Sequence, residues 1–218
     1  MSEAVKRPLL IFDFDGTIAN TIDTGIGIFN EISSDYGLEP FTSEDVVELR
    51  KLNIRAVLSR IGISKITAIK IATRIRKEIH DRMDEVDIFP GTAEAVSSLH
   101  EEGFRMGILS SNSKDNIKEF ISRFDLSHCF EFIEAGVSLF GKSKRINQVL
   151  KKQKVACTDV LYIGDETRDM EAARKSEVST VAVCWGANEK EAMVTEGPDF
   201  CIENPGELIS CAKEFASR

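Results

Sequence analysis

The feature that most constrains the fold of this chain is a regular alternation of short apolar runs with helical segments from Pro90 onward. Several of the apolar runs contain no polar alternation, which is typical of strands that helices cover on both faces. Strands that each lead into a helix form a parallel sheet, because parallel neighbours need a crossover connection. The pattern therefore predicts an α/β fold. The expected strands are residues 104–109, 130–135, 160–163, 180–184 and 199–202, and the expected helices are 92–102, 114–123, 143–152, 167–175, 188–195 and one from 205.

One further strand, residues 8–14, stands apart from this alternating region. Residues from about 19 to 87 show helical periodicity and no strand pattern between them. Within this stretch Ile71, Ile75, Ile79 and Met83 recur every four residues and form an apolar stripe. We therefore expect an α/β core made of residues 1–17 and 90–218, with an all-helical domain, residues 18–89, inserted after the first strand.

The composition narrows the classes of partner and location. The 218-residue chain has 36 acidic against 28 basic side chains, a formal net charge of -8, which disfavours a nucleic-acid binder. The apolar run before Asp13 is too short for a signal sequence or a membrane span, so we expect a cytoplasmic protein without membrane partners. The five cysteines form no CxxC pair and are expected to be reduced thiols.

Polar side chains follow four of the predicted strands. In an open parallel sheet, ligands bind beyond the carboxyl ends of the strands. The residues at these ends are Asp13, Asp15 and Gly16 after the first strand, Ser110, Ser111 and Asn112 after the second, Lys142 after the third, and Asp165 and Asp169 after the fourth. Taken singly, each residue has an ordinary structural explanation, such as a turn, a helix N-cap or a solvated charge. Their occurrence at four successive strand ends favours one shared pocket.

The side chains of this predicted pocket fall into two chemical sets. The carboxylates of Asp13, Asp15 and Asp165 repel one another unless a cation offsets their charge, and a hard divalent cation such as Mg2+ prefers oxygen ligands. A lysine with hydroxyl and amide donors suits the oxygens of a phosphate group. Together the two sets predict phosphoryl transfer with a carboxylate as the nucleophile.

The same residues resemble the motifs of the haloacid dehalogenase-like hydrolases. Residues 13–17, Asp-Phe-Asp-Gly-Thr, look like the DxDGT nucleophile motif, and residues 164–169 are similar to the fourth motif, GDxxxD. Ser110 and Lys142 look like the second and third motifs. The motif order and the helical insertion resemble the subgroup of phosphoglycolate phosphatase and β-phosphoglucomutase, which implies a Rossmann-like core with a helical cap.

The resemblance implies roles for the three acidic residues at the strand ends. Asp13 would attack phosphorus and become an aspartyl phosphate. Asp15 would protonate the leaving oxygen and then activate water. Mg2+ would be held by the Asp13 carboxylate, the main-chain carbonyl of Asp15 and Asp165. Dehalogenases lack the second aspartate of the first motif, so the presence of Asp15 favours phosphoryl transfer.

The resemblance also implies roles for the remaining pocket residues. Ser110, with Ser111 and Asn112 beside it, would bind the phosphate. Lys142 would neutralise the phosphate and orient the nucleophile, and Asp169 would position Lys142 or a metal-bound water. The cap would close over the site and select the leaving group.

Several alternatives remain open from the sequence. Lys144 competes with Lys142 as the motif lysine. The leading function is a phosphatase for a small-molecule phosphate ester, with phosphoglycolate-like esters as candidates. A sugar phosphomutase and a non-enzymatic regulatory protein are the alternatives, and the chain could be a monomer or a homodimer.

The predicted cap is unusually basic. Residues 50–82 hold ten Lys and Arg against two acidic residues. This surface either attracts an anionic leaving group or is a solvated helix face.

Overall fold

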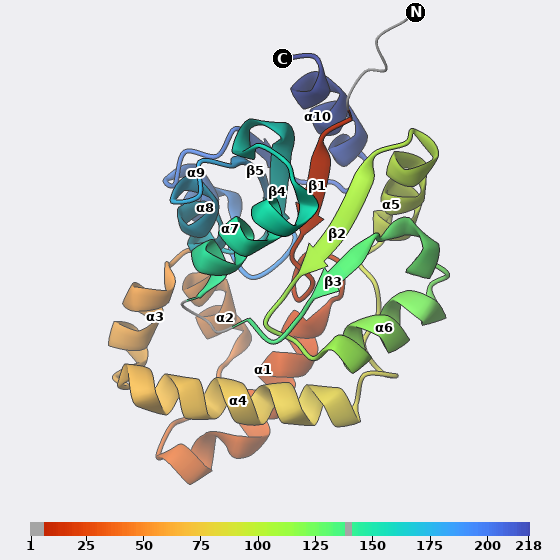
Figure 1. Ribbon diagram of the computed structural model, residues 1–218. Coiled ribbons are helices and arrows are strands. Elements are labelled where there is room, and N and C mark those ends of the chain that lie inside the picture. Colours follow the sequence, from red (N-terminus) through yellow and green to blue (C-terminus); the bar gives the residue numbers. More distant parts are fainter. Residues whose placement is uncertain (1–6, 138–140) are drawn as a thin grey trace, which may run out of the picture.

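The computed structural model describes residues 7–137 and 141–218, so residues 1–6 of the predicted core segment lie outside it. Within this part of the chain, six strands form one sheet in the order β3-β2-β1-β4-β5-β6 (Figure 1). Every strand pair is parallel, which confirms the predicted α/β class. The strands are β1 Leu9–Phe12, β2 Arg105–Leu109, β3 Phe132–Glu134, β4 Val160–Gly164, β5 Ser179–Val183 and β6 Phe200–Ile202.

Helices cover both faces of the sheet, and β1 shows why its sequence lacks alternation. Successive side chains of a strand point to opposite faces. Leu10 and Phe12 pack in the larger core cluster with α5, α6 and α10, whereas Leu9 and Ile11 pack in a second cluster with α7 and α8. Both sets are apolar because both faces are buried. The helices are α5 Thr92–Glu101, α6 Lys114–Arg123, α7 Lys142–Gln153, α8 Thr167–Arg174, α9 Lys190–Val194 and α10 Glu207–Ala216.

The chain between β1 and α5 is helical, as its sequence predicts. It contains α1 Thr21–Ile32, α2 Ser43–Arg50, α3 Ile54–Ile61 and α4 Lys65–Asp81. The side chains of Thr42, Asn53 and Ser64 each accept a hydrogen bond from the first turn of the helix that follows. We call residues 21–81 the helical insertion. Its helices lie beyond the ends to which β1, β2 and β3 point (Figure 1). The division into a core and a separate cap domain stays a prediction.

The predicted apolar stripe of α4 lies in the core. Ile71, Ile79 and Met83 are buried, and Ile75 is partly buried against the same cluster. No helix in the described residues is long and apolar enough to cross a membrane.

The first strand is shorter than its sequence predicts. It ends at Phe12, and Phe14 is buried in the loop that follows. Gly16 has a φ of +76°, a conformation that favours glycine, and it closes a tight turn in which the amides of Ile18 and Ala19 donate to the Phe14 carbonyl. The turn therefore ends the strand and leaves Asp13 at the edge of the sheet. The other predicted elements differ from the structure by a residue or two at their ends.

A glycine in β2 is required by a ring on the neighbouring strand. Gly107 pairs with Phe132 of β3, and a Cβ at position 107 would lie 2.1 Å from Cζ of that ring.

We expect Gly107→Ala to lower the free energy of unfolding by about 1–3 kcal/mol, because the added methyl overpacks a buried site. Gly27→Ala is the control, since Gly27 is exposed in α1 with nothing within 4 Å of an added Cβ. Alanine favours a helix, so this variant should be as stable as the parent or more stable. Urea denaturation compares the two, and equal stabilities would contradict this packing.

Candidate active site

The carboxyl ends of the central strands bring the predicted pocket residues together. The amide of Asp13 donates to the carbonyl of Ile163 at 2.8 Å, which extends the pairing of β1 with β4. Ser110 follows β2, and its amide donates to Glu134 at the end of β3. Adjacent parallel strands in register end at the same edge, so residues far apart in the sequence meet there.

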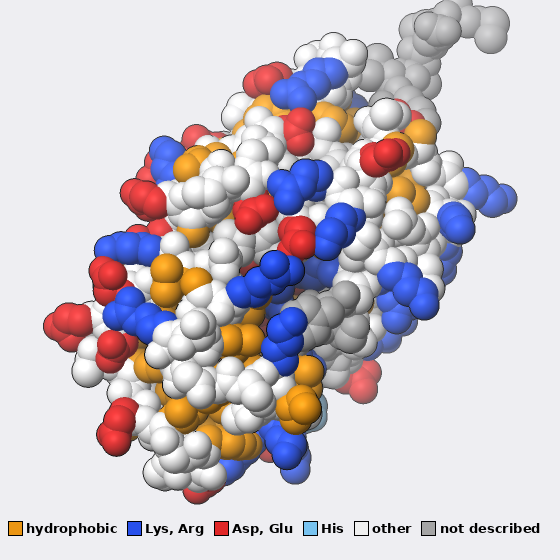
Figure 2. Space-filling model, turned by 90° about the vertical axis from the view of Figure 1, so that its left-hand side faces the viewer, with side chains coloured by type: hydrophobic (Ala, Val, Ile, Leu, Met, Phe, Trp, Pro, Cys, Tyr) orange, Lys and Arg blue, Asp and Glu red, His pale blue; other side chains and the backbone are white. Residues whose placement is uncertain are grey.

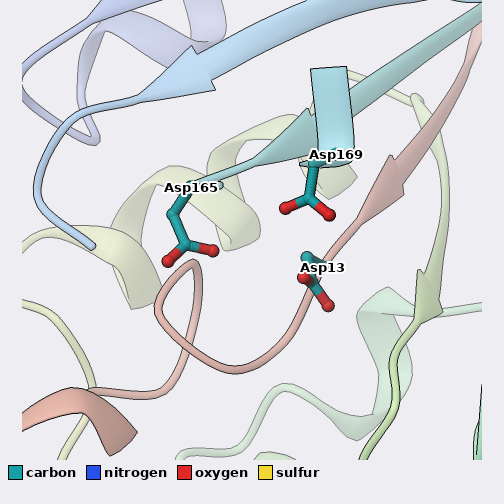
Figure 3. Close-up of side chains that lie close together, drawn as sticks. All are labelled: Asp13, Asp165 and Asp169. Atoms are coloured by element: carbon teal, nitrogen blue, oxygen red, sulfur yellow. The ribbon is translucent and has the colours of Figure 1, made fainter. Parts of the chain in front are cut away.

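Three carboxylates form the centre of the site. Asp13 follows β1, Asp165 follows β4 and Asp169 lies in the first turn of α8, and their side chains gather around one point (Figure 3). Each offers an oxygen, and the three oxygens lie within 4.8 Å of one another. All three residues are buried. The sequence predicts Asp13 and Asp165 in this cluster, whereas the third carboxylate belongs to Asp169 and not to Asp15.

Lys142 is the cation of the cluster. Its Nζ donates to Asp13 Oδ2 at 2.6 Å and also to Asp169 Oδ1. Burial disfavours the charged amine, but the carboxylates of Asp13 and Asp169 outweigh this effect and hold the pKa of Lys142 well above its usual value. The competing Lys144 is exposed. The structure therefore places Lys142, and not Lys144, beside the first-motif aspartate.

Asp15 points away from the three-carboxylate cluster and into a set of neutral donors. Its Oδ1 accepts from Asn112 Nδ2 at 2.9 Å, and its Oδ2 accepts from Ser110 Oγ at 3.3 Å. Among these three residues Ser110 and Asn112 bond to the Asp15 carboxylate, whereas Ser111 is partly buried beside them. The N-cap of α6 is Ser113. Ser110, Ser111 and Asn112 thus precede the helix cap instead of forming it. Burial raises the pKa of Asp15, and the donors only partly offset this.

Burial is also the largest influence on the pKa values of Asp13 and Asp165. It raises the pKa of Asp13 to about 7, with Lys142 opposing the shift and Asp169 adding to it. It raises the pKa of Asp165 well above its usual value, and nearby acidic residues add to the shift. These carboxyls therefore resist simultaneous ionisation unless a cation in addition to Lys142 offsets their charge.

The loop after β5 supports Asp165, and the sequence interpretation missed it. Thr17 Oγ1 donates to Asp165 Oδ1 at 2.9 Å, and the amide of Ala187 donates to Asp165 Oδ2 at 2.7 Å. A Cβ at Gly186 would lie 2.2 Å from the Gly16 carbonyl oxygen and 2.4 Å from Asp165 Cβ. Trp185, in the same loop, donates from Nε1 to the Thr17 carbonyl at 3.1 Å. Gly186 lies two residues beyond the predicted strand 180–184, but a single glycine does not indicate which side chain packs against it.

The donor set fits a divalent metal ion. Three buried carboxylates with oxygens this close repel one another, and a hard divalent cation with oxygen ligands would relieve the repulsion. Asp13, Asp165 and Asp169 are the residues whose side chains could hold it. The sequence also predicts the main-chain carbonyl of Asp15 as a metal ligand. That carbonyl lies in the loop after β1.

Known proteins resemble the chain over most of its length. A sequence model described as haloacid dehalogenase-like hydrolase matches residues 10–183, which is most of the chain. The chain belongs to this family. This confirms the resemblance drawn from the motifs, and the match runs from β1 through the helical insertion to the end of β5.

Two named relatives are similar to almost the whole chain. A phosphoglycolate phosphatase from Synechococcus elongatus is 33% identical over 206 residues, which cover 94% of this chain and 97% of the relative. A pyrophosphatase, PpaX, from Listeria innocua is 25% identical over 215 residues, covering 96% of this chain and 98% of the relative. These matches support an enzyme that hydrolyses phosphoric esters.

Solved structures share the fold. A haloacid dehalogenase-like family hydrolase from Streptococcus pneumoniae has a TM-score of 0.77 at 19% identity, and the alignment covers 94% of this chain and 98% of the other. A hydrolase from Pseudomonas syringae has a TM-score of 0.70 at 19% identity, with 94% and 97% covered. At these identities the likeness shows the fold alone.

The close approach of Gly186 to Gly16 and Asp165 generates a prediction. Gly186→Ala should lower hydrolytic activity at least tenfold, because the methyl group pushes the supporting loop away from Asp165 and shifts a carboxylate that could hold the metal ion. Gly206→Ala is the control, since Gly206 is exposed before α10 and an added Cβ meets nothing within 4 Å. Initial rates on p-nitrophenyl phosphate compare the two. Parent-like activity in Gly186→Ala would show that the loop adapts and does not hold Asp165.

Proposed function

We propose that the protein is a Mg2+-dependent phosphatase that hydrolyses a small-molecule phosphate monoester through an aspartyl phosphate on Asp13. The observation that carries the proposal is the arrangement of Asp13. Its carboxylate is buried, bonded to Lys142 and grouped with Asp165 and Asp169, while Asp15 sits nearby among neutral donors. A nucleophile and a separate proton-carrying acid in one pocket are what two-step phosphoryl transfer requires.

In the first step an oxygen of Asp13 attacks phosphorus and the bond from phosphorus to the leaving oxygen breaks. Asp15 gives its proton to that oxygen. Burial raises the pKa of Asp15, which favours the protonated form that this step needs. In the second step Asp15 takes a proton from water, the water oxygen attacks phosphorus, and phosphate leaves with the Asp13 carboxylate restored.

The other residues hold the reacting groups in place. Lys142 neutralises charge on the phosphate oxygens and fixes the Asp13 side chain. Ser110, Ser111 and Asn112 stand where the phosphate would be bound, and Asp169 holds Lys142. Mg2+, when bound by Asp13 and Asp165, would supply positive charge to the phosphate oxygens.

Phosphoglycolate-like esters are the first candidates for the substrate. The Synechococcus elongatus relative is named a phosphoglycolate phosphatase, and that likeness covers almost the whole of both chains. A cytoplasmic location also remains part of this proposal.

The phosphomutase and regulatory alternatives use the same fold. A regulatory protein would not need the nucleophile, yet Asp13, Asp15, Lys142 and Asp165 are all present. Lys142 donates to Asp13, and Ser110 and Asn112 donate to Asp15. Among the residues that the structure describes, none of the pocket side chains specifically favours transfer of the phosphate back to a sugar, so we prefer hydrolysis.

The nucleophile and the metal can be tested together. Phosphate release from a panel of monoesters should require Mg2+, stop with EDTA and fall by several orders of magnitude in Asp13→Asn, since an amide is a poor nucleophile. Asp15→Asn should lose about 10²–10⁴-fold, the usual value of a general acid. Asp84→Asn, an exposed change of the same kind, should behave as the parent. Turnover that survives Asp13→Asn would overturn the assignment of the nucleophile.

The two candidate lysines form a matched pair of variants. Lys142→Met should lose phosphatase activity and also about 3–5 kcal/mol of stability, because it leaves buried carboxylates without their cation. Lys144→Met removes the same charge two residues away at an exposed position and should change neither. The measurements are kcat/KM and the thermal midpoint. Loss of activity in Lys144→Met alone would reverse the assignment.

A further inference from the structure

A cavity of about 340 Å3 lies between the helical insertion and the strand ends. Its polar floor is formed by Asp15, Ser111 and Asn112. Most of its wall is apolar and comes from α1, α4 and the loop before α2, with the side chains of Ile22, Ile26, Phe29, Phe41, Ile75 and Ile79. Because the proposed function assigns Asp15 to protonate the leaving oxygen, the leaving group would occupy this cavity.

Arg76 of α4 is the charged group that the insertion contributes to this cavity. The arginines near it in sequence have partners: Arg74 pairs with Asp35 and Glu78, and Arg82 pairs with Glu31. Arg76 has no hydrogen bond or ion pair with any residue that the structure describes. Its charge acts through space on Asp15, whose pKa it lowers against the larger effect of burial.

Arg168 of α8 lines the same cavity from the side of the sheet. Its guanidinium pairs with Glu166, but within the described residues its Nε is buried without a hydrogen-bond partner. Arg168 also lines a second cavity of about 470 Å3, between α3, α4, α7 and α8. Figure 2 shows the face to the left in Figure 1, where basic and hydrophobic side chains lie side by side.

Arg76 is half-buried beside an apolar wall, and Arg168 has a buried Nε that lacks an acceptor among the described residues, so both guanidinium groups can gain charge-assisted hydrogen bonds from an anion that enters. We propose that the leaving group of the substrate itself carries an oxyanion, a carboxylate or a phosphate, and that Arg76 and Arg168 are the residues that select it. This inference rests on the proposed function and adds the chemistry of the leaving group and the residues that read it. A site built to bind a charged group rejects the neutral analogue strongly, because its own charge is then left unpaired.

Another assignment would place both arginines on the phosphate that is transferred. The two assignments differ in one respect. Arginines on the transferred phosphate would act on every ester alike, whereas arginines on the leaving group act only where that group is anionic. The ratio of two esters therefore separates them.

The decisive experiment compares 2-phosphoglycolate with 2-hydroxyethyl phosphate, which replaces the carboxylate by a hydroxymethyl group, and includes inorganic pyrophosphate. The parent should prefer an anionic leaving group by at least about tenfold in kcat/KM. In Arg76→Met this ratio should fall toward one, and Arg76→Lys should keep part of it. Lys77→Met removes a charge from the next, exposed position of α4 and should retain the parent ratio. A ratio unchanged in Arg76→Met, or an equal loss on both esters, overturns the proposal.

Arg168 is tested by Arg168→Lys, which keeps the charge but not the planar guanidinium. A lowered ratio supports its contact with the leaving group, and an unchanged ratio removes Arg168 from the proposal. The larger preference, for phosphoglycolate or for pyrophosphate, identifies the oxyanion as a carboxylate or a phosphate.

A binding measurement keeps this inference separate from the proposed function. Isothermal titration with Mg2+ present compares 3-phosphonopropionate with propylphosphonate, neither of which can be hydrolysed at its carbon–phosphorus bond. The parent should bind the carboxylate compound at least about tenfold more tightly, and Arg76→Met should lose that difference. If the parent shows this binding preference but hydrolyses none of the esters, the proposed phosphatase function is contradicted and the anion site is supported. Equal binding of the two compounds by the parent would overturn the anion site.

Discussion

The ion pairs of Lys142 with Asp13 and Asp169 are the interaction on which the arrangement of the site depends. They join the end of β1, the start of α7 and the first turn of α8, three segments that are distant in the sequence. Buried charges are tolerated only when they are paired and hydrogen-bonded, so these segments must meet in one geometry. The excess of carboxylate over amine that remains is what makes the cluster suitable for a divalent cation.

A second set of contacts ties the helical insertion to this centre. Arg50 at the end of α2 donates from Nη2 to the Gly186 carbonyl at 2.7 Å, and Asn188 Nδ2 donates to the carbonyls of Arg50 and Leu52. The same loop gives the Ala187 amide to Asp165. The insertion that lines the cavity beside Asp15 is therefore attached to the loop that supports Asp165.

Much of the fold could be predicted because its signals are local. The strand and helix alternation, the helical insertion and the apolar stripe of α4 are each written in short stretches of sequence, and the structure agrees with them to within a residue or two. The end of β1 was predicted two residues late, since the apolar Phe14 follows Asp13 in the sequence whereas the turn at Gly16 ends the strand at Phe12. The support of Asp165 by the loop after β5 was missed, because that contact joins segments with no local signal.

The sequence by itself determined which chemical groups stand at the strand ends, because parallel strands that lead into helices place their carboxyl ends at one edge of a sheet. The tertiary structure decided which of those groups contact one another. It put the carboxylate of Asp169 in the cluster, turned Asp15 toward Ser110 and Asn112, and chose Lys142 over Lys144. It also left Arg76 facing a cavity while Arg74 and Arg82 found partners. The reason is physical: the direction and pairing of a side chain depend on neighbours from other segments, and spacing along one chain does not contain them.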